Sequence, residues 1–445
     1  MASQIIALAN CWGTRYGGIN TFNTGLMKAL GQREDRDDFK LICIVDAESA
    51  TEDDKAHAER SGVCLLEGSA DMLLSNAEAI AETIEAVAHL IDVKTPTLWL
   101  GHDDKTGPLA LALREKLGGK VVLFNHMAHV AYQGFKKGDS LSADEKKERQ
   151  RNLFLQADHA ICVGPRLHEE LTDLLATSPN RPTVTMLMPG LDEPSDYEVE
   201  YRTTQPASFR GFAAGRLGPE DDRIKQGRLA IRAFVEAVED QKTTNILTKL
   251  SGTPRICLMG VENEQESELR PTLEEWAKRQ LQVELIPFTA DRQKYFHELA
   301  SSSFAMMLSW HEGFGLVGWE AIAARVPLIL GKNSGLWQFL EGKTGAAYIG
   351  QSIFPVDIRG HLSDNDNNEN HRPEDVEAVK DAIEKLAASG DNAKKSRDQL
   401  VQPDYQRRLD VATGGNRFYC LCRTISCSRN APKSHRRFST SRALS

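Results

Sequence analysis

Short apolar runs alternate with helical stretches along most of the chain, and this alternation limits what the chain can fold into. The runs typical of buried strands lie at residues 4–10, 40–46, 63–68, 97–102, 120–126, 159–164 and 183–190, and then at 255–260, 283–289, 304–308 and 326–330. Near-continuous apolar strands separated by helices are typical of parallel sheets that are covered on both faces. The pattern predicts an α/β fold with open, doubly wound sheets, whose ligands bind at the carboxyl ends of the strands.

A linker divides this pattern at residues 194–206, where acids, prolines and threonines replace the apolar runs. Polar connections of this composition are typical of domain boundaries. We therefore predict one Rossmann-like domain at residues 1–195 and a second at residues 207–395. At 445 residues, the chain is long enough for each domain to bury a core of its own.

The composition changes in a predicted tail at residues 400–445, which from about Val411 onward is basic, rich in serine and arginine, and nearly free of acids. Cys420, Cys422 and Cys427 cluster there, but a C-x-C-x4-C pattern with no fourth ligand nearby is a poor match to a zinc site. Two interpretations stay open. The tail is either a disordered basic arm that binds anions, or sequence of altered frame or splicing that replaced another C-terminus.

Charge and hydropathy argue against several classes of function. The net charge of −9 provides no overall attraction to nucleic acid or to anionic membranes. No apolar run approaches the ~20 residues of a membrane-spanning helix, and the first residues lack the basic segment of a signal peptide. Five cysteines lie singly in or near predicted strands, at Cys11, Cys43, Cys64, Cys162 and Cys257. Their spacing does not match a zinc site, which predicts reduced thiols and a cytoplasmic location.

The segment from Ser309 to Leu330 joins two predicted strands through a glycine turn and a short helix. Two acids, Glu312 and Glu320, flank the start of this helix. Bare backbone N–H groups and the positive end of the helix dipole make such a joint a site for phosphate. An anion site between two carboxylates suits a nucleotide sugar, with the diphosphate at the helix end and the hydroxyls of the sugar and the ribose on the acids. An ordinary strand–turn–helix with two solvated glutamates is the alternative.

Other glycine turns end predicted strands in both domains. Gly17 and Gly18 follow the first strand, where glycine allows the backbone to approach a ligand closely. In the second domain, Gly215 and Arg216 end a strand, and Lys225 is predicted to begin the next helix. An isolated Arg or Lys is usually a solvated surface residue. The turn after the first strand, at residues 13–18, does not have the G-x-G-x-x-G pattern, which argues against an NAD-dependent enzyme.

The E-x7-E spacing of Glu312 and Glu320, with Gly-Phe-Gly between the acids, resembles the retaining family-4 glycosyltransferases of the GT-B fold. Further matches at residues 156–171 and 188–193 extend the resemblance over residues 1 to about 350. It implies two Rossmann-like domains that face each other across a cleft. It also implies a nucleotide-diphosphate sugar as donor substrate, no cofactor and no metal ion.

The resemblance assigns roles to individual residues. Arg216 and Lys225 would neutralise the leaving diphosphate, and Glu312 would orient the transferred sugar. A histidine would complete the catalytic set, either His126 or His129. The substrate-binding positions that it implies are Gly17, Gly18, His129, Gly260, Gly313, Phe314, Gly315, Leu316 and Glu320, of which Glu320 would bind the ribose.

The choice between the two histidines stays open. Residues 101–111, Gly-His-Asp-Asp-Lys-Thr-Gly and onward, resemble the H-D-x-x-T-G loop of the glycogen- and starch-synthase branch of the family. Residues 129–135 resemble the active-site H-N-L-A-Y-Q-G segment of that branch but have one residue fewer after the histidine. His126 or His129 therefore takes the active-site position. The alternative for each is a hydrogen-bonded residue at a strand end.

The resemblance implies transfer of a hexosyl group to an acceptor hydroxyl with retention of configuration. In the front-side route proposed for the family, the departing phosphate oxygen takes the acceptor proton. Double displacement with Glu312 as nucleophile is less favoured. The acceptor is a carbohydrate, a lipid or another hydroxyl compound that the sequence does not identify. The alternatives are a phosphorylase or epimerase on the same fold, and a nucleotide-sugar sensor that binds without turnover.

Overall fold

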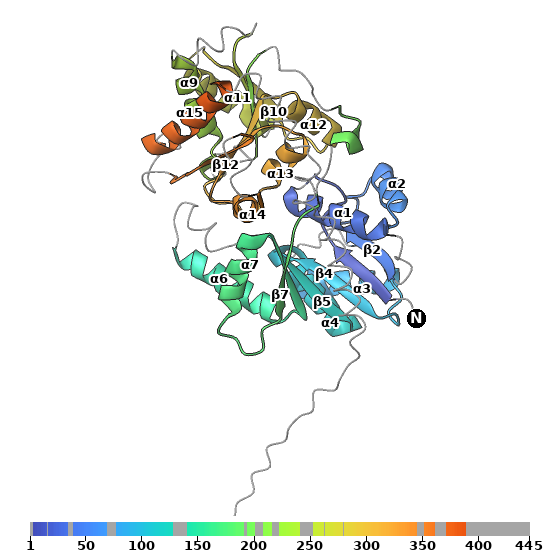
Figure 1. Cartoon of the computed structure of the whole chain (residues 1–445). Helices are drawn as coiled ribbons and strands as arrows, with labels where there is room; N and C mark the ends of the chain where they lie inside the picture. Colours follow the sequence, from blue (N-terminus) through green and yellow to red (C-terminus); the bar gives the residue numbers. More distant parts are fainter. Residues whose placement is uncertain are drawn as a thin grey trace, which may run out of the picture.

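Two α/β domains, one above the other in Figure 1, make up the described part of the chain. The computed structural model describes residues 3–15, 17–33, 39–68, 77–127, 140–190, 194–200, 208–215, 222–240, 252–261, 263–278, 280–344, 351–360 and 371–388. The predicted site residues Arg216 and His129 lie outside these ranges, and so does the predicted tail at residues 400–445.

Seven parallel strands form the sheet of the first domain, in the spatial order β3-β2-β1-β4-β5-β6-β7. They are β1 (Ser3–Leu8), β2 (Phe39–Val45), β3 (Cys64–Glu67), β4 (Thr97–His102), β5 (Lys120–Asn125), β6 (His159–Val163) and β7 (Thr183–Leu187). The central strands are buried: Ile6 pairs with Ile42 on one side and Trp99 on the other, and all three side chains are inaccessible. Each strand corresponds to one predicted apolar run.

Helices connect these strands: α1 (Gly18–Gly31), α2 (Glu52–Arg60), α3 (Ala77–Leu90), α4 (Asp103–Leu117), α6 (Ser140–Leu155) and α7 (Pro165–Leu175). Local sequence explains where several of them start. The Thr51 side chain accepts from Asp54 N while the Asp54 carboxylate accepts from Thr51 N, which caps α2. Pro165 occupies the first turn of α7, where its missing N–H costs nothing.

Six parallel strands form the second sheet, in the spatial order β10-β9-β8-β11-β12-β13. They are β8 (Arg210–Ala214), β9 (Arg255–Val261), β10 (Gln282–Pro287), β11 (Phe304–Met307), β12 (Leu328–Gly331) and β13 (Ile353–Val356). Sequence analysis missed β13, because it is short and contains Pro355. An edge strand accepts a proline that a central strand would reject.

The helices of the second domain are α8 (Asp222–Lys225), α9 (Gly227–Glu239), α11 (Asn263–Trp276), α12 (Arg292–Ala300), α13 (Leu316–Ala323), α14 (Gly335–Thr344) and α15 (Pro373–Ala388). The short 3-10 helix η2 (Pro194–Tyr197) begins the connection between the domains. Lys225 ends α8 and does not begin the long helix. Gln226 adopts a left-handed conformation with φ 62°, so the chain turns before α9 starts at Gly227.

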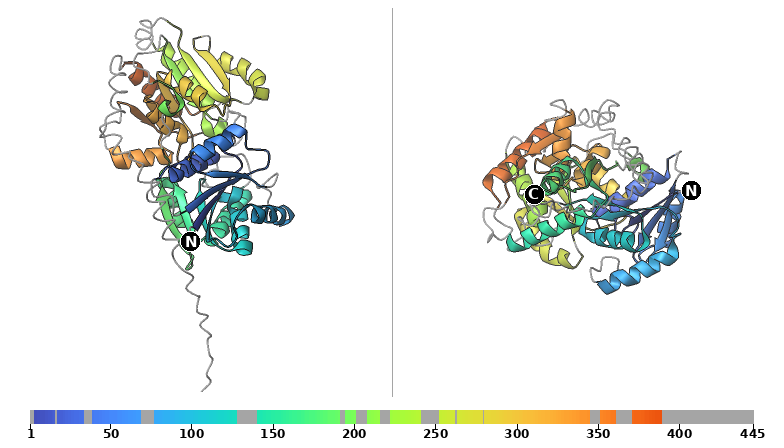
Figure 2. Two further views of the ribbon diagram at one scale, coloured as in Figure 1. Left: turned by 90° about the vertical axis from the view of Figure 1, so that its right-hand side faces the viewer. Right: turned by 90° about the horizontal axis from the view of Figure 1, so that it is seen from below.

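The strand order of each sheet reverses once, between β1 and β4 in the first sheet and between β8 and β11 in the second. In doubly wound sheets, the crevice at such a reversal is the usual ligand site. Helix α1 follows β1 and α13 follows β11, so both begin at these reversals. Figures 1 and 2 show α1 and α14 between the two sheets.

A continuous apolar core crosses the domain boundary. The cluster that fills the first domain, from Ile5 to Leu187, also contains Phe314, Trp319 and Phe339 of the second domain. A separate cluster lies on the other face of the second sheet, under α9 and α15. Since Phe314 and Trp319 lie in or beside the predicted substrate site, the site is built on packed side chains.

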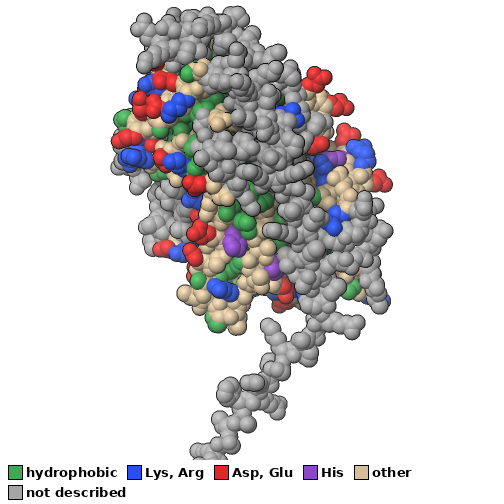
Figure 3. Space-filling view, in the orientation of Figure 1, with side chains coloured by type: hydrophobic (Ala, Val, Ile, Leu, Met, Phe, Trp, Pro, Cys, Tyr) green, Lys and Arg blue, Asp and Glu red, His purple; other side chains and the backbone are tan. Residues whose placement is uncertain are grey.

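Acidic and basic side chains are interspersed on the outer surface of the second domain (Figure 3). On α9, Arg232 lies 3.6 Å from Glu236, and on α15, Lys380 lies 3.6 Å from Glu384. Pairs at i, i+4 spacing stabilise exposed helix faces slightly. None of the helices in the described part of the chain combines the length and apolar character of a membrane span.

Candidate functional site

Glu312 and Lys225 form an ion pair at the reversal of strand order in the second sheet. Lys225 Nζ lies 2.6 Å from Glu312 Oε2, and Ser309 Oγ donates to the same oxygen at 3.1 Å. Burial opposes the charge of Glu312, but the Lys225 ammonium and the two hydrogen bonds outweigh it and lower the pKa of the carboxyl. Two predicted catalytic residues, 87 positions apart, are thus in direct contact.

The loop after β12 holds the backbone of Glu312. Glu312 N donates to Asn333 O at 3.0 Å, and Gly335 N donates to Glu312 O at 3.2 Å. A Cβ at Gly335 would lie 2.2 Å from Gly313 O, so this position has no room for a side chain. These contacts between the two loops hold the backbone of Glu312 in place, whatever its side chain contacts.

Gly315 caps α13 in a conformation that favours glycine, with φ 113° and ψ 66°. A Cβ there would lie 2.4 Å from Met307 Cε, so a side chain would also require the flexible end of Met307 to move. The helix then begins at Leu316, and the N–H groups of its first turn have no intrahelical acceptor. This is the local geometry on which the prediction of a phosphate site rests.

Loops of the first domain contact this joint from across the domain boundary. A Cβ at Gly18, the first residue of α1, would lie 3.3 Å from Leu316 Cδ1. A Cβ at Gly313 would lie 2.9 Å from the carbonyl oxygen of His126. Four predicted site residues from two domains therefore meet at one place.

Phe314 packs into the shared core instead of facing solvent. Its ring centroid lies 5.8 Å from that of Trp319 in an edge-to-face arrangement, and its side chain is buried. On the side of the first domain, a Cβ at Gly164 would lie 2.7 Å from Phe314 Cδ2. Phe314 therefore fixes the joint against the first domain.

Gly215 leaves room for the aliphatic part of the Lys225 side chain, and Gly260 packs against Gly215. A Cβ at Gly215, at the carboxyl end of β8, would lie 3.3 Å from Lys225 Cγ. A Cβ at Gly260, with φ 110°, would lie 2.4 Å from Gly215 O. The backbone N of Trp310 donates to Ile224 O at 2.8 Å, which ties the turn of Lys225 to the segment before Glu312. Gly260 therefore contacts Gly215, and Gly215 in turn contacts Lys225.

Glu320 lies inside α13, and two side chains of α12 hold its carboxylate. Arg292 Nη2 lies 2.7 Å from Oε1, and Tyr295 OH donates to Oε2 at 2.6 Å. Burial and then the charge of Glu320 raise the pKa of Tyr295, so the phenol keeps its proton. Sequence analysis missed both donors. Their i, i+3 spacing puts them on one face of α12, but spacing does not reveal the partner.

His126 follows β5 and belongs to a buried polar network. Its Nε2 lies 2.9 Å from His102 Nδ1, and His102 Nε2 lies 3.0 Å from Asn23 Oδ1. Burial lowers the pKa of His102 to about 3, and burial together with the neighbouring ring lowers the pKa of His126. Asp103 Oδ2 accepts from the backbone N of His126 at 2.8 Å. Sequence analysis missed the part played by Asn23.

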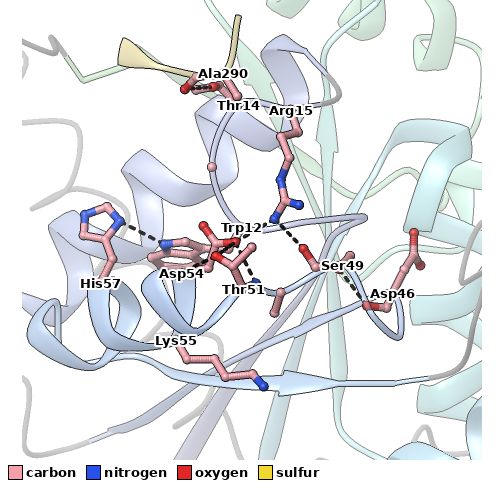
Figure 4. Close-up of polar contacts among 12 residues, drawn as sticks. Trp12, Thr14, Arg15, Asp46, Ser49, Thr51, Asp54, Lys55, His57 and Ala290 are labelled. Carbon is pink, nitrogen blue, oxygen red and sulfur yellow. Dashed lines mark hydrogen bonds and ion pairs between the residues drawn. The ribbon is translucent and has the colours of Figure 1, made fainter. Parts of the chain in front are cut away.

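The loop before Gly17 is held by α2 and touches the second domain (Figure 4). Arg15 Nη2 lies 2.6 Å from Asp54 Oδ2, and Thr14 Oγ1 donates to Ala290 O at 3.1 Å. Gly17 caps α1 with φ 97° and ψ −167°. Glycine is required there because other residues rarely adopt this conformation.

A cavity of about 450 Å³ lies beside the same loop. Its walls come from both domains and include Thr14, Lys28, Asp54, Asp196 and Arg292. Arg292 also binds the Glu320 carboxylate. The cavity therefore adjoins the Glu320 side of the site, and its lining includes neither Lys225 nor Glu312.

The described residues contain no group of three or more His, Cys, Asp or Glu side chains placed to hold a metal ion. Charged groups at the joint include Lys225, Glu312 and Glu320 with its partner Arg292. A cation, the start of a helix and two carboxylates on one strand–helix joint can bind a ligand that has a charged centre and hydroxyl groups.

A family model described as "Family 4 Glycosyltransferase in conflict systems" matches residues 6–409 of the chain. No curated protein matches the chain in sequence. The matched span contains the first sheet from Ile6 onward, the whole second sheet and every predicted site residue.

Solved structures with the same two-domain GT-B fold resemble the chain over nearly its whole length. Sucrose-phosphate synthase from Thermosynechococcus elongatus has a TM-score of 0.61 at 16% identity, covering 95% of this chain and 99% of its own. The HepE protein of Anabaena, solved with UDP and glucose, has a TM-score of 0.60 at 15% identity, with coverage of 95% and 100%. A glycosyltransferase from Rickettsia africae has a TM-score of 0.63 at 10% identity, with coverage of 96% and 99%. These likenesses confirm the predicted fold.

Proposed function

Because the chain belongs to the family-4 glycosyltransferases of conflict systems, we propose that it transfers a hexosyl group from a nucleotide-diphosphate sugar to an acceptor hydroxyl with retention of anomeric configuration. The observation that carries the proposal is the contact of Lys225 with Glu312 beside the start of α13. The Lys225 ammonium and the N-terminus of α13 would bind the diphosphate, and the Glu312 carboxylate would bind the sugar.

The positions of the charges support a front-side mechanism without a metal ion. The bond between the anomeric carbon and the phosphate oxygen breaks, and negative charge grows on the diphosphate. Lys225 and the N–H groups at the start of α13 stabilise this charge, and single preorganised donors of this kind contribute roughly 3–4 kcal/mol. The acceptor oxygen forms the new bond on the same face, and its proton passes to the departing phosphate oxygen. In this mechanism Arg216 is the second cation.

Glu312 and Glu320 would have different tasks. Glu312 lies at the turn before the helix, next to Lys225, where the sugar follows the diphosphate. Glu320 lies inside α13 and is oriented by Arg292 and Tyr295. Each carboxylate oxygen of Glu320 accepts one bond from the protein and keeps a lone pair for a ribose hydroxyl.

The test is an assay of the full chain with a panel of nucleotide sugars and hydroxyl acceptors, with liberated nucleotide diphosphate as the readout. UDP-glucose comes first, because the HepE neighbour was solved with UDP and glucose. Proton NMR of the product reads the anomeric configuration, and a parallel reaction with chelator tests metal independence. Glu312→Gln serves as the inactive control.

Each alternative has its own outcome in this assay. Donor binding without release of nucleotide for any acceptor indicates a sensor. Turnover that requires phosphate indicates a phosphorylase, and a product formed without acceptor indicates an epimerase. An inverted product would refute the front-side mechanism. Loss of activity with chelator, restored by a divalent cation, would refute metal independence.

A further inference from the structure

The histidine pair at the ends of β4 and β5 is connected to a buried amide on α1. Asn23 Oδ1 lies 3.0 Å from His102 Nε2, and His102 Nδ1 lies 2.9 Å from His126 Nε2. The side chains of Asn23 and His102 are 0% and 1% exposed. Polar groups buried without partners are costly, so each of these contacts pairs one donor with one acceptor.

This chain of contacts determines where the hydrogen sits on each ring. A neutral imidazole has one N–H and one bare nitrogen, and an amide oxygen only accepts. His102 Nε2 therefore donates to Asn23 Oδ1, which leaves His102 Nδ1 bare. His126 Nε2 must then donate to His102 Nδ1, and His126 Nδ1 is the bare nitrogen. In the structure the Asn23 amide turns Oδ1 toward His102 and Nδ2 toward Cys43 Sγ, at 3.5 Å. The opposite orientation, with the Cys43 S–H donating to Oδ1, would reverse both tautomers, and the nitrogen spectrum described below distinguishes the two.

The orientation of the His126 ring is fixed as well as its tautomer. The Phe22 ring lies edge-to-face against it, with centroids 5.0 Å apart, and Phe124 stacks on the His102 ring at 5.2 Å. Asp103 Oδ2 accepts from the backbone N–H groups of His126 and Met127. The imidazole therefore has little freedom to exchange its two nitrogens by rotation.

We propose that Asn23 and His102 are positioning residues that hold His126 as the neutral Nε2–H tautomer, so that Nδ1 accepts a hydrogen bond from a hydroxyl of the bound sugar. This role rests on the proposed function, in which His126 contacts the transferred sugar. A bare nitrogen accepts from a hydroxyl, whereas it has nothing to donate to a phosphate oxygen. His126 would thus recognise the sugar, while Lys225 and the helix end bind the diphosphate.

The tautomer is measurable on the full chain without substrate. The protein is labelled with ¹⁵N-histidine, and His126→Gln and His102→Gln identify the two resonance pairs among the 12 histidines. We expect His126 Nε2 at the position of an N–H nitrogen and His126 Nδ1 at that of a bare nitrogen. The reverse pattern would overturn the proposal. Because this measurement needs no substrate, it does not depend on the proposed function.

Asn23→Asp tests the positioning role. A carboxylate beside His102 favours the charged imidazolium, whose two nitrogens both donate. His126 Nε2 would then have to accept, so its hydrogen moves to Nδ1. We expect transfer to fall about 10–100-fold, by analogy with the loss seen when partners that orient metal-binding histidines are replaced, with unchanged binding of free nucleotide diphosphate.

The matched control is Asn20→Asp, on the same helix and also buried at 2% exposure. Its side-chain oxygen accepts from Asn10 N, and the substitution keeps that acceptor. It should leave the His126 tautomer unchanged. An inverted tautomer in Asn23→Asp with undiminished transfer would overturn the positioning role. If Asn23→Asp does not fold, the spectrum of the wild-type protein still decides the tautomer. Failure of the wild-type protein to release nucleotide from any donor would refute the proposed function instead.

Discussion

Lys225 Nζ lies 2.6 Å from Glu312 Oε2, although the two residues belong to different strand–helix connections. Both side chains are largely buried, with 32% and 21% of their surface exposed. The ammonium keeps the carboxylate ionised against the effect of burial. A donor diphosphate would therefore meet a lysine that already shares one of its three N–H groups.

Lys225→Gln should reduce kcat more than it weakens donor binding, because the diphosphate charge grows in the transition state. The expected loss in kcat is about 100-fold, the scale for removal of one preorganised donor. Steady-state kinetics and calorimetry with free nucleotide diphosphate measure the two effects. Lys332→Gln is the control, because Lys332 pairs with Asp357 at an exposed site. An unchanged kcat with a raised KM would show that Lys225 only binds.

The same substitution should shift the pH dependence of transfer. In the wild-type protein the pKa of Glu312 lies below its ordinary value, so the carboxylate remains ionised as pH falls through that value. Removing the ammonium leaves burial as the main influence and raises the pKa. The acid limb of kcat/KM should therefore move to higher pH in Lys225→Gln. An acid limb that does not move would mean that Glu312 does not control it.

Glu320→Gln should weaken the binding of free nucleotide diphosphate by about 1–2 kcal/mol, the scale of one charge-assisted hydrogen bond. Tyr295→Phe should have a smaller effect of the same sign, because Arg292 still holds the carboxylate. Glu312→Gln should leave this binding nearly unchanged and strongly reduce transfer. Calorimetry and a turnover assay measure both. Equal losses of nucleotide affinity in Glu320→Gln and Glu312→Gln would contradict the two roles.

Gly164→Ala and Gly118→Ala separate the domain contact from backbone strain. Both glycines have positive φ with ψ near 180°, so alanine strains both by about 1–3 kcal/mol. Only at Gly164 would the new Cβ meet Phe314, at 2.7 Å, while nothing lies within 4 Å at Gly118. We expect similar losses of unfolding free energy from strain, with reduced transfer only in Gly164→Ala. Equal activity in the two variants would show that the contact with Phe314 is dispensable.

Asp103→Asn should change the pH dependence of stability. Burial raises the pKa of Asp103 to about 7 from 3.8, so the folded state binds the extra proton and stability falls as pH rises through this range. Burial lowers the pKa of His102 to about 3 from 6.5, so the unfolded state binds the extra proton and stability rises with pH. The two slopes oppose each other. Urea unfolding between pH 4 and 6.5 should show a steeper rise with pH in Asp103→Asn, and an unchanged slope would contradict the assignment.

Local pattern was enough to predict most of the fold. Apolar runs located all seven strands of the first sheet and most of the second. The two departures have local causes. The strand β13 is short and contains Pro355, and the left-handed Gln226 separates Lys225 from the helix that it was expected to begin.

Some features of the candidate site follow from local sequence, and others depend on residues that are distant in the chain. The glycine cap of α13 and the positions of Glu312 and Glu320 around it follow from one continuous segment. The partners of the two acids, Lys225 and Arg292, lie 87 and 28 residues away, and no spacing in the sequence indicates them.

The sequence by itself located most of the strands and the glycine turns that end them, because backbone preference and side-chain periodicity are local properties. Only the tertiary structure decided which charges pair and which side chains contact His126. These depend on the order of strands in each sheet and on the approach of the two domains, which bring Asn23, His102 and His126 together from three connections. A buried polar side chain without a hydrogen-bond partner costs free energy, so the buried groups of the site pair with the donors and acceptors beside them.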